Sequence, residues 1–377
     1  MLNLEQLTEK SLQANFTEVQ QRHFDRLMSE LEVISGGLGF AELKAKAEAG
    51  SKEALQVMRD YIVKKEQIVE FLEIKKIPNE TKSAEELCME FRGEPVKVAH
   101  QRLHALMETS AYMKGHHMFR QGIDSEVVSR GYSSKEQMLG KIVAHMAGDG
   151  ILADSLTNDI QGTFYDRSMR LFKANDRFTG LQTFDANTQF LSVVAFMLEG
   201  KTPAFELAKF SDRLKDSELY NNDKNVWNRR ISPDGVLDGQ LYADDYLIEI
   251  LANYFLGKTE EVEKLYKEMA ERQGGDFWGD GIVLESPEAD ISINERSKDL
   301  LLAIITQALV ADPQKAYARW LKGKELDLYD KDKKLWYERK NHREAGKIYQ
   351  NHTVENELLD IMAEAIFIKL GLHDDIE

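Results

Sequence analysis

Several stretches of the chain are apolar on nearly every side of a helix. Residues 243–255, ADDYLIEILANYF, place apolar side chains around most of the helical circumference, so a helix there must be buried. The same pattern recurs at 190–198, 300–310 and 358–371. No window shows the alternation of apolar and polar residues that is typical of several strands. The pattern therefore predicts an all-α fold.

The apolar helices belong to a repeated unit with a period on the order of 55 residues. Each unit runs from an aromatic corner through a polar loop to the buried helix, and a more amphipathic helix follows in most units. The corners are Leu171-Phe172, Leu219-Tyr220, Phe277-Trp278 and Leu328-Tyr329. Such helix pairs suit a double-layered ring, because the inner helix touches neighbours on both sides. An open superhelix is the alternative, and the long loops favour closure.

The N-terminal segment differs from the rest of the chain. Residues 1–92 form strongly charged amphipathic helices, and nothing in them resembles a unit of the repeat. We expect two domains, a helical hairpin or arm at 1–92 and the helical ring at 93–377. The arm either abuts the ring or binds a protein partner, since amphipathic helices also dock on partners.

Composition limits which classes of partner the protein can bind and which cellular compartment suits it. Apolar residues make up 42% and charged residues 30% of the 377 residues, and the formal net charge is -16. This charge argues against nucleic acid and anionic membranes as partners, and no apolar run is long enough to span a bilayer. The single cysteine, Cys88, excludes an internal disulfide framework and fits a reducing compartment. We expect a cytoplasmic protein with Cys88 as a packing residue.

The repeat resembles a known superfamily. Asp/Asn-rich loops, the corner at Leu335-Trp336-Tyr337 and the all-apolar helices are similar to the six-hairpin (α/α)6 toroids. That superfamily includes glycoside hydrolases, unsaturated glucuronyl hydrolases and N-acylglucosamine 2-epimerases. Residues 234–237, 242–243 and 247–249 resemble one segment of the toroid half of YyaL-type proteins, with about one helical turn inserted. Residues 296–299 resemble a second segment, whereas the thioredoxin-like half with its paired cysteines is absent.

The resemblance implies a funnel at the end of the ring where loops enter the inner helices. The residues nominated there as catalytic acids are Asp234, Asp244 and Glu295, and Asp245 and Glu355 also lie at helix starts. The nominated substrate contacts are Trp227, Tyr242, Trp278, Arg296, Trp336 and His352. Carboxylates interleaved with flat aromatic rings suit a carbohydrate, because two carboxyl groups serve as acid and as base or nucleophile.

Asp244 is the sharpest candidate among these acids. It falls on a row with Leu237, Ile248 and Phe255, and an apolar setting of this kind raises the pKa of a carboxyl, as a general acid requires. A satisfied buried acid is the structural alternative. Other polar residues at helix starts are expected to be caps, and these are Asp185, Asp238 and Asn351. The recurrence of Trp227, Trp278 and Trp336 at corners is also explained by packing between hairpins.

One helix carries a possible metal-binding pattern. His100, His104 and Glu108 are four residues apart and share one helical face, which could hold zinc. The fourth ligand is not evident, and a solvated polar face is the favoured interpretation, so no metal is predicted. No phosphate-binding loop, nucleophile elbow or His-Glu-x-x-His motif is present, and no cofactor is predicted.

Together these patterns predict a carbohydrate-active enzyme. We expect a glycoside hydrolase or a sugar epimerase that acts on a small-molecule or oligosaccharide substrate through acids at the funnel. The alternative is a non-catalytic helical-repeat protein that binds a peptide or protein partner.

Overall fold

The computed structural model describes residues 82–123, 132–175, 182–224, 226–239, 242–271, 297–325, 329–341 and 347–375, with scattered positions between 28 and 64. The chain divides into two compact units, Met1–Asn79 and Glu80–Glu377. The described positions of the first unit are helical. The first helix after residue 82, α5 (Ala84–Gly93), belongs to the second unit.

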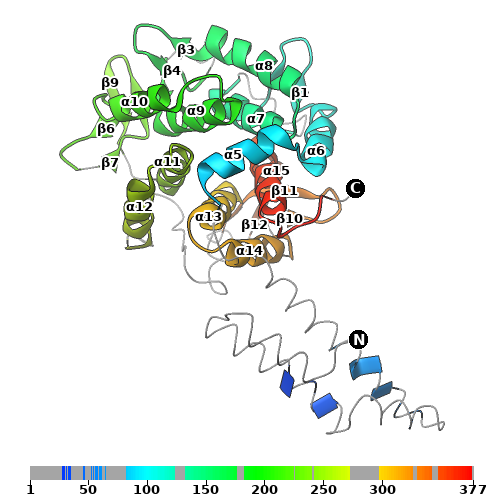
Figure 1. Ribbon diagram of the computed structural model, residues 1–377. Coiled ribbons are helices and arrows are strands. Elements are labelled where there is room, and N and C mark those ends of the chain that lie inside the picture. The colour runs from blue at the N-terminus through cyan, green and yellow to red at the C-terminus, as the bar shows by residue number, and fades with distance from the viewer. Residues whose placement is uncertain are drawn as a thin grey trace. The chain divides into compact units, whose positions relative to one another are not determined.

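The second unit is a closed ring of inner helices (Figure 1). Over the described residues these are α7 (Ser134–Met146), α9 (Ala186–Glu199), α11 (Ala243–Phe255), α13 (Ser297–Val310) and α15 (Val354–Lys369). Each packs against the next, and α15 packs against α7, so five inner helices close the ring in this part of the chain. Nearly all of their residues are buried, as helices that are apolar all round require.

A second layer of helices surrounds the inner ring. These outer helices are α6 (Lys97–Met107), α8 (Gly150–Asp159), α10 (Ala204–Leu214), α12 (Thr259–Glu271) and α14 (Pro313–Glu325). The last four each pack against the inner helix that precedes them, and α6 packs against α7 and α15. A short π-helix, η1 (Ile160–Phe164), continues α8. The double-layered ring confirms the predicted all-α toroid and excludes the open superhelix.

A short β-ribbon precedes most inner helices. The ribbons pair β1 (Tyr112–Met113) with β2 (Met118–Phe119), β3 (Tyr165–Asp166) with β4 (Leu171–Phe172), β6 (Tyr220–Asn221) with β7 (Val226–Trp227), and β10 (Tyr329–Asp330) with β11 (Leu335–Asn341). In each ribbon a tyrosine lies opposite a phenylalanine or tryptophan. The ring centroids of these pairs are 4.8 to 5.3 Å apart, an aromatic packing distance.

The ribbons correct the predicted alignment of the repeat. The sequence equated Phe172 with Tyr220 and Tyr329, but the structure pairs Phe172 with Tyr165 across its ribbon. Phe172 is therefore equivalent to Trp227 and Trp336, and each unit contains both aromatic residues. The turns match as well, because three of them place a residue in left-handed backbone: His117 (φ 51), Arg170 (φ 57) and Lys334 (φ 57).

Side-chain amides fix the ribbons to the inner helices. Gln137 of α7 accepts a hydrogen bond from the backbone N–H of Phe119 at 2.8 Å and donates to its carbonyl at 2.7 Å. Gln189 of α9 makes the same pair of bonds to Phe172 at 2.9 and 2.7 Å. Each amide acts as one more strand residue, so the buried strand edge keeps its hydrogen bonds.

The remaining strands form two further antiparallel arrangements. One sheet has the order β5 (Phe184–Asp185), β8 (Arg230–Ser232), β9 (Gly235–Asp238), and it places Asp185 opposite Arg230. The other extends the last ribbon with β12 (Lys347–His352), which leads directly into α15.

Helix α5 covers the C-terminal ends of the inner helices, at the middle of the ring in Figure 1. Arg92 donates to the carbonyls of Met197 and Leu198 at the end of α9, at 2.6 and 3.1 Å. Lys82 donates to the carbonyl of Lys369 at the end of α15 at 2.5 Å. These bonds satisfy carbonyl groups that a helix end leaves without partners. The sequence-predicted packing role of Cys88 is confirmed, because its side chain is buried in α5.

No helix among the described residues is long and apolar enough to cross a membrane.

The contact between Phe119 and α7 is testable at one glycine. A Cβ added to Gly140 would lie 2.5 Å from the Phe119 ring, whereas a Cβ on Gly150 would meet no atom within 4 Å. We expect Gly140→Ala to lower the free energy of unfolding by about 1–3 kcal/mol, because the core is overpacked. Gly150→Ala should be neutral or stabilising by up to about 1 kcal/mol. Urea unfolding followed by circular dichroism measures both, and equal stability of the two variants would contradict this packing.

Candidate active site

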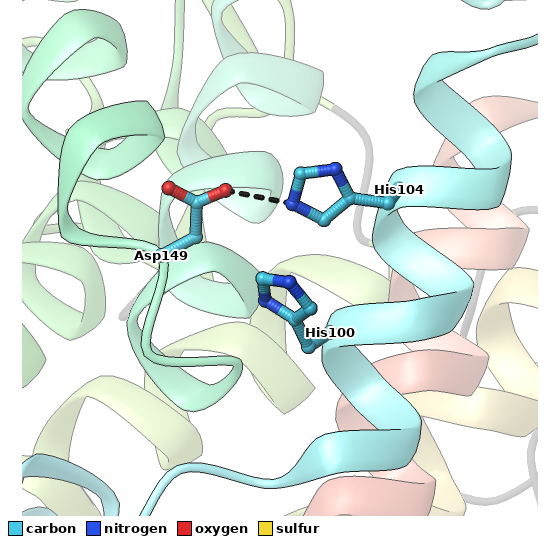
Figure 2. A group of neighbouring side chains, drawn as sticks. All are labelled: His100, His104 and Asp149. Atoms are coloured by element: carbon cyan, nitrogen blue, oxygen red, sulfur yellow. Dashed lines mark hydrogen bonds and ion pairs between the residues drawn. The ribbon is translucent and has the colours of Figure 1, made fainter. Parts of the chain in front are cut away.

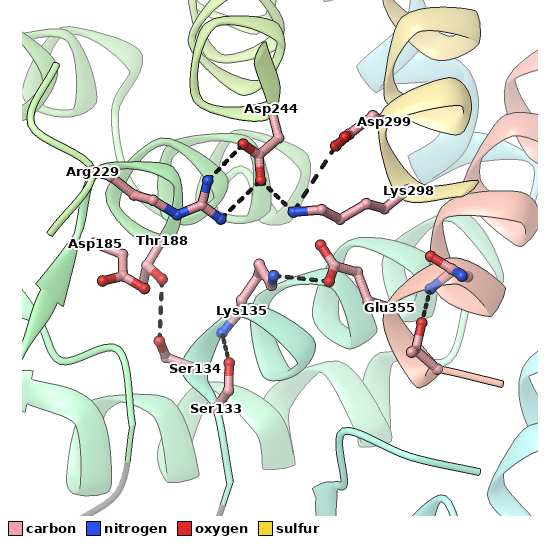
Figure 3. A network of polar contacts seen from close by, with 12 residues as sticks. Ser133, Ser134, Lys135, Asp185, Thr188, Arg229, Asp244, Lys298, Asp299 and Glu355 are labelled. Atoms are coloured by element: carbon pink, nitrogen blue, oxygen red, sulfur yellow. Dashed lines mark hydrogen bonds and ion pairs between the residues drawn. The ribbon is translucent and has the colours of Figure 1, made fainter. Parts of the chain in front are cut away.

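Charged side chains gather where the N-terminal ends of the inner helices meet. We call this set the N-terminal charge cluster, and it comprises Lys135, Glu136, Asp185, Arg229, Asp244, Asp245, Lys298, Asp299 and Glu355. Every inner helix contributes at least one member at its first turn or N-cap. In Figure 3 the side chains of Arg229, Asp244 and Lys298 point toward one another, with Lys135 and Glu355 facing them.

Asp244 lies at the centre of this cluster. Its carboxylate accepts two hydrogen bonds from the Arg229 guanidinium, at 3.0 and 3.2 Å, and one from Lys298 Nζ at 2.5 Å. Arg229 also stacks on the Tyr242 ring, with 3.9 Å between its Cζ and the ring centroid. Lys298 lies 3.9 Å from a carboxylate oxygen of Asp299. Two cations from different elements therefore hold one buried carboxylate.

These cations reverse the expected direction of the pKa shift of Asp244. Burial alone favours the neutral acid, but the charges of Lys298 and then Arg229 outweigh it and hold the pKa of Asp244 below its usual value. The predicted apolar row is also incomplete, because Leu237 is half exposed on β9 rather than packed beside α11. The expectation of a raised pKa at Asp244 is wrong, and Asp244 is ionised.

The neighbouring acid has the opposite property. Asp245 is 1% exposed, and among the described residues neither of its carboxyl oxygens has a hydrogen-bond partner. Arg229 Nη1 lies 4.0 Å from Asp245 Oδ2. Burial and then the charge of Asp244 raise the pKa of Asp245 well above its usual value. Two consecutive acids on α11 are therefore held in different protonation states.

A second pair repeats this arrangement on α7 and α15. Glu355 forms an ion pair with Lys135 at 2.8 Å. Burial opposes its ionisation, but Lys135 and then Lys298 lower its pKa. Glu136 is buried, and burial raises its pKa, with a further contribution from the charge of Glu355. The cluster thus combines carboxyls with lowered pKa, carboxyls with raised pKa and cations within one electrostatic network.

No residue expected to cap a helix makes a capping hydrogen bond with its side chain. Asp185 is the N-cap residue of α9, as predicted, but its carboxylate instead accepts two bonds from Arg230 at 2.6 and 2.9 Å. The N-caps of α11 and α15 are Tyr242 and Thr353, rather than Asp238 and Asn351. The assignments of Asp238 and Asn351 were wrong because these residues belong to the strands β9 and β12, which the loop pattern did not indicate.

The other nominated residues that the structure describes lie outside the N-terminal charge cluster. Trp227 and Trp336 are buried in the ribbons, so their rings pack between hairpins and are not free to stack on a sugar. His352 is also buried, stacks on Tyr337 with ring centroids 5.1 Å apart, and lies 3.6 Å from Asp330. Asp234 occupies an exposed turn between β8 and β9 and is not part of the cluster.

Three nominated residues lie outside the described part of the chain: Trp278, Glu295 and Arg296. Among the nominated residues that the structure describes, Asp244 and Tyr242 both lie at the N-terminal charge cluster. Asp245 and Glu355 also lie there. The cations Lys135, Arg229 and Lys298 were missed. A signal was available, since Lys135-Glu136, Asp244-Asp245 and Lys298-Asp299 are charged pairs at the second and third positions of otherwise apolar helices.

Two cavities lie away from the cluster. One of about 470 Å³ is lined by residues of η1, α9 and α10, including Phe196, Phe210 and Arg213. The other, of about 510 Å³, lies against α6 and α15 and is lined by Arg102 and Glu357. Burial and the charge of Asp360 raise the pKa of Glu357 to about 8. Neither of these two cavities is lined by Asp244 or Asp245.

No family model and no curated protein match this chain. Solved structures do resemble it. A cellobiose 2-epimerase from Spirochaeta thermophila DSM 6192 is 11% identical, with a TM-score of 0.47 over 73% of this chain and 98% of that chain. A D-mannose isomerase is 9% identical, with a TM-score of 0.43 over 65% and 72%. An alpha-amylase from Clostridium perfringens is 12% identical, with a TM-score of 0.44 over 76% and 86%. At these identities no residue role is carried over from any of them.

The ion pairs of Asp244 can be tested through stability. Asp244→Asn leaves Arg229 and Lys298 partly buried without their shared carboxylate, and breaking a buried pair in this way costs about 3–5 kcal/mol. The matched control is Asp234→Asn in the exposed turn, which should stay within about 0.5 kcal/mol of the wild type. Thermal and urea unfolding distinguish them, and an Asp244→Asn protein as stable as this control would refute the ion-pair network.

Glu249 predicts a pH dependence of stability. It is buried in α11 and accepts a hydrogen bond from Trp227 Nε1 at 2.7 Å, and burial raises its pKa to about 7 against this bond. The pKa of Glu249 in the folded protein exceeds its value in the unfolded chain, which is about 4.3. The stability that protonated Glu249 contributes to the fold is therefore fully present below pH 4.3 and is lost as pH rises through 7. The wild type should therefore lose more unfolding free energy between pH 5 and 8 than Glu249→Gln does. Parallel pH profiles of the two proteins that show no difference would contradict the raised pKa.

Proposed function

We propose that the protein is a carbohydrate-processing enzyme, either a glycoside hydrolase or a sugar epimerase, with its reacting groups in the N-terminal charge cluster. The observation that carries the proposal is the pairing of Asp244 and Asp245. An ionised and a neutral carboxyl side by side, with cations beside them, are the groups that acid–base chemistry on a sugar requires. The resemblance of the loops and inner helices to sugar-processing toroids supports the substrate class.

The two acids have different roles in this proposal. Asp245 is the proton donor, because burial and the charge of Asp244 raise the pKa of its carboxyl and favour the protonated form. Asp244 is a positioning residue, because Arg229 and Lys298 occupy both of its oxygens and make it a poor nucleophile. It holds these two cations in place, and they stabilise negative charge that develops on a substrate oxygen.

Each of the two reactions uses this set in a defined way. In hydrolysis, Asp245 protonates the leaving glycosidic oxygen, and an ionised carboxylate such as Glu355 activates the attacking water. In epimerisation, an ionised carboxylate removes the proton beside the sugar carbonyl, Arg229 or Lys298 stabilises the enediolate oxygen, and a neutral acid returns a proton to the other face. The Tyr242 ring, which stacks on Arg229, supplies a flat surface beside the cluster.

A deuterium-exchange assay separates the two reactions. The full chain is incubated with a panel of aldoses and disaccharides in D2O and followed by proton NMR. Loss of the signal of the hydrogen beside the carbonyl indicates epimerase chemistry, and new reducing-end signals indicate hydrolysis. Activity on none of the panel would favour the alternative of a helical-repeat protein that binds a peptide or protein partner.

The role of Asp245 is tested by Asp245→Asn. An amide replaces a carboxyl that is already neutral, so the melting temperature should stay close to that of the wild type. Turnover should fall by about 100-fold or more, because the proton donor is gone. Asp234→Asn, in the exposed turn between β8 and β9, is the matched control and should keep both stability and turnover. An Asp245→Asn enzyme with full turnover would reject Asp245 as the donor.

A further inference from the structure

Two histidines and an aspartate outside the charge cluster converge on one point (Figure 2). His100 and His104 lie one turn apart on α6, and Asp149 lies in the turn between α7 and α8. One potential ligand atom from each of the three residues lies within 4.8 Å of the other two. His104 Nε2 is 3.0 Å from Asp149 Oδ2, and the two imidazole rings have centroids 4.3 Å apart.

The backbone holds these three residues in place before any ligand binds. Asp149 caps α8, with its Oδ1 accepting from the Leu152 N–H at 3.0 Å, so only Oδ2 faces the histidines. Gly148, in left-handed backbone, packs closely against Pro95, and the Val96 N–H donates to the Met146 carbonyl at 3.0 Å. The start of α6 is therefore fixed to the turn that carries Asp149.

We propose that His100, His104 and Asp149 bind a divalent cation of the zinc class. Imidazole nitrogens and a carboxylate oxygen form a common ligand set for Zn²⁺, with bonds of about 2.0–2.2 Å and tetrahedral geometry. Tetrahedral ligands at that bond length lie about 3.4 Å apart. The three atoms here lie within 4.8 Å of one another, so side-chain rotations that draw them together complete the site. Water takes the fourth position, because His100 and His104 are exposed.

The structure replaces the third ligand that the sequence spacing suggested. Glu108 shares the histidine face of the helix, but it is the C-cap residue of α6 and pairs with Lys114 at 2.9 Å. Asp149 comes from a different element, so a bound cation links α6 to the turn between α7 and α8. A cation that binds only when α6 and this turn are folded together shifts the folding equilibrium toward the folded protein, and so it stabilises the first hairpin of the ring.

Calorimetric titration of the full chain with ZnCl2 tests this site, with the protein first treated with a chelator. Single variants His100→Ala and His104→Ala should each weaken binding at this site by more than about 10-fold. Asp149→Asn should do the same while α8 stays capped, because asparagine caps as well as aspartate. Zn²⁺ should also raise the melting temperature of the wild type, and this rise should be lost in the same three variants.

Two matched controls make the outcome decisive. Glu108→Gln removes the ligand that spacing alone would choose, and His116→Gln removes another exposed imidazole. Both should bind Zn²⁺ as the wild type does. Wild-type affinity in His100→Ala, or a loss of affinity in Glu108→Gln equal to that in Asp149→Asn, would overturn the assignment. Titration with CoCl2 adds a spectroscopic check, because tetrahedral Co²⁺ with these ligands gives visible absorption bands that His104→Ala should lose.

Discussion

The common direction of the inner helices governs the electrostatics of the ring. Because an outer helix returns the chain after α7, α9, α11 and α13, the inner helices all point the same way, and their N-terminal ends gather at one end of the ring. Helix N-termini carry partial positive charge and C-termini carry partial negative charge. The C-terminal end is met by the donors Lys82 and Arg92, and the N-terminal end is met by carboxylates such as Asp244. The charges at each end are therefore a consequence of the fold.

The N-terminal end contains more than this electrostatic balance requires. Carboxylates alone would suit the helix ends, yet the cations Arg229 and Lys298 bind between them and keep Asp244 ionised. Once Asp244 carries its charge, a second buried carboxylate beside it is strongly disfavoured, and Asp245 remains protonated. The different protonation states of two adjacent residues thus follow from packing, and no special chemistry of either side chain is needed.

The fold could be predicted from the sequence further than the site could. Apolar runs such as residues 300–310 are buried wherever the chain places them, so the inner helices followed from periodicity. The ribbons were misaligned because Tyr165 and Phe172 were not recognised as a pair, although the same seven-residue spacing recurs at Tyr220 and Trp227. Arg229 was missed because its partner, Asp244, is set by sheet and helix geometry rather than by spacing along the chain. An isolated helix pattern shows an acid in an apolar row but not the cation that approaches it from the turn between β7 and β8.

The contrast between the two ends of the ring favours function over structure at the N-terminal charge cluster. A ring built from leucine and isoleucine contacts does not need buried ions, since replacing a buried ion pair by apolar residues is often neutral or stabilising. At the C-terminal end, Arg92 and Lys82 simply satisfy carbonyls of the inner helices. At the N-terminal end, Asp245 is buried with no hydrogen-bond partner for its carboxyl oxygens among the described residues, which is a cost without a structural return. Groups kept in such costly, shifted states are concentrated at sites that transfer protons. The asymmetry therefore supports the proposal that the N-terminal charge cluster is the functional site.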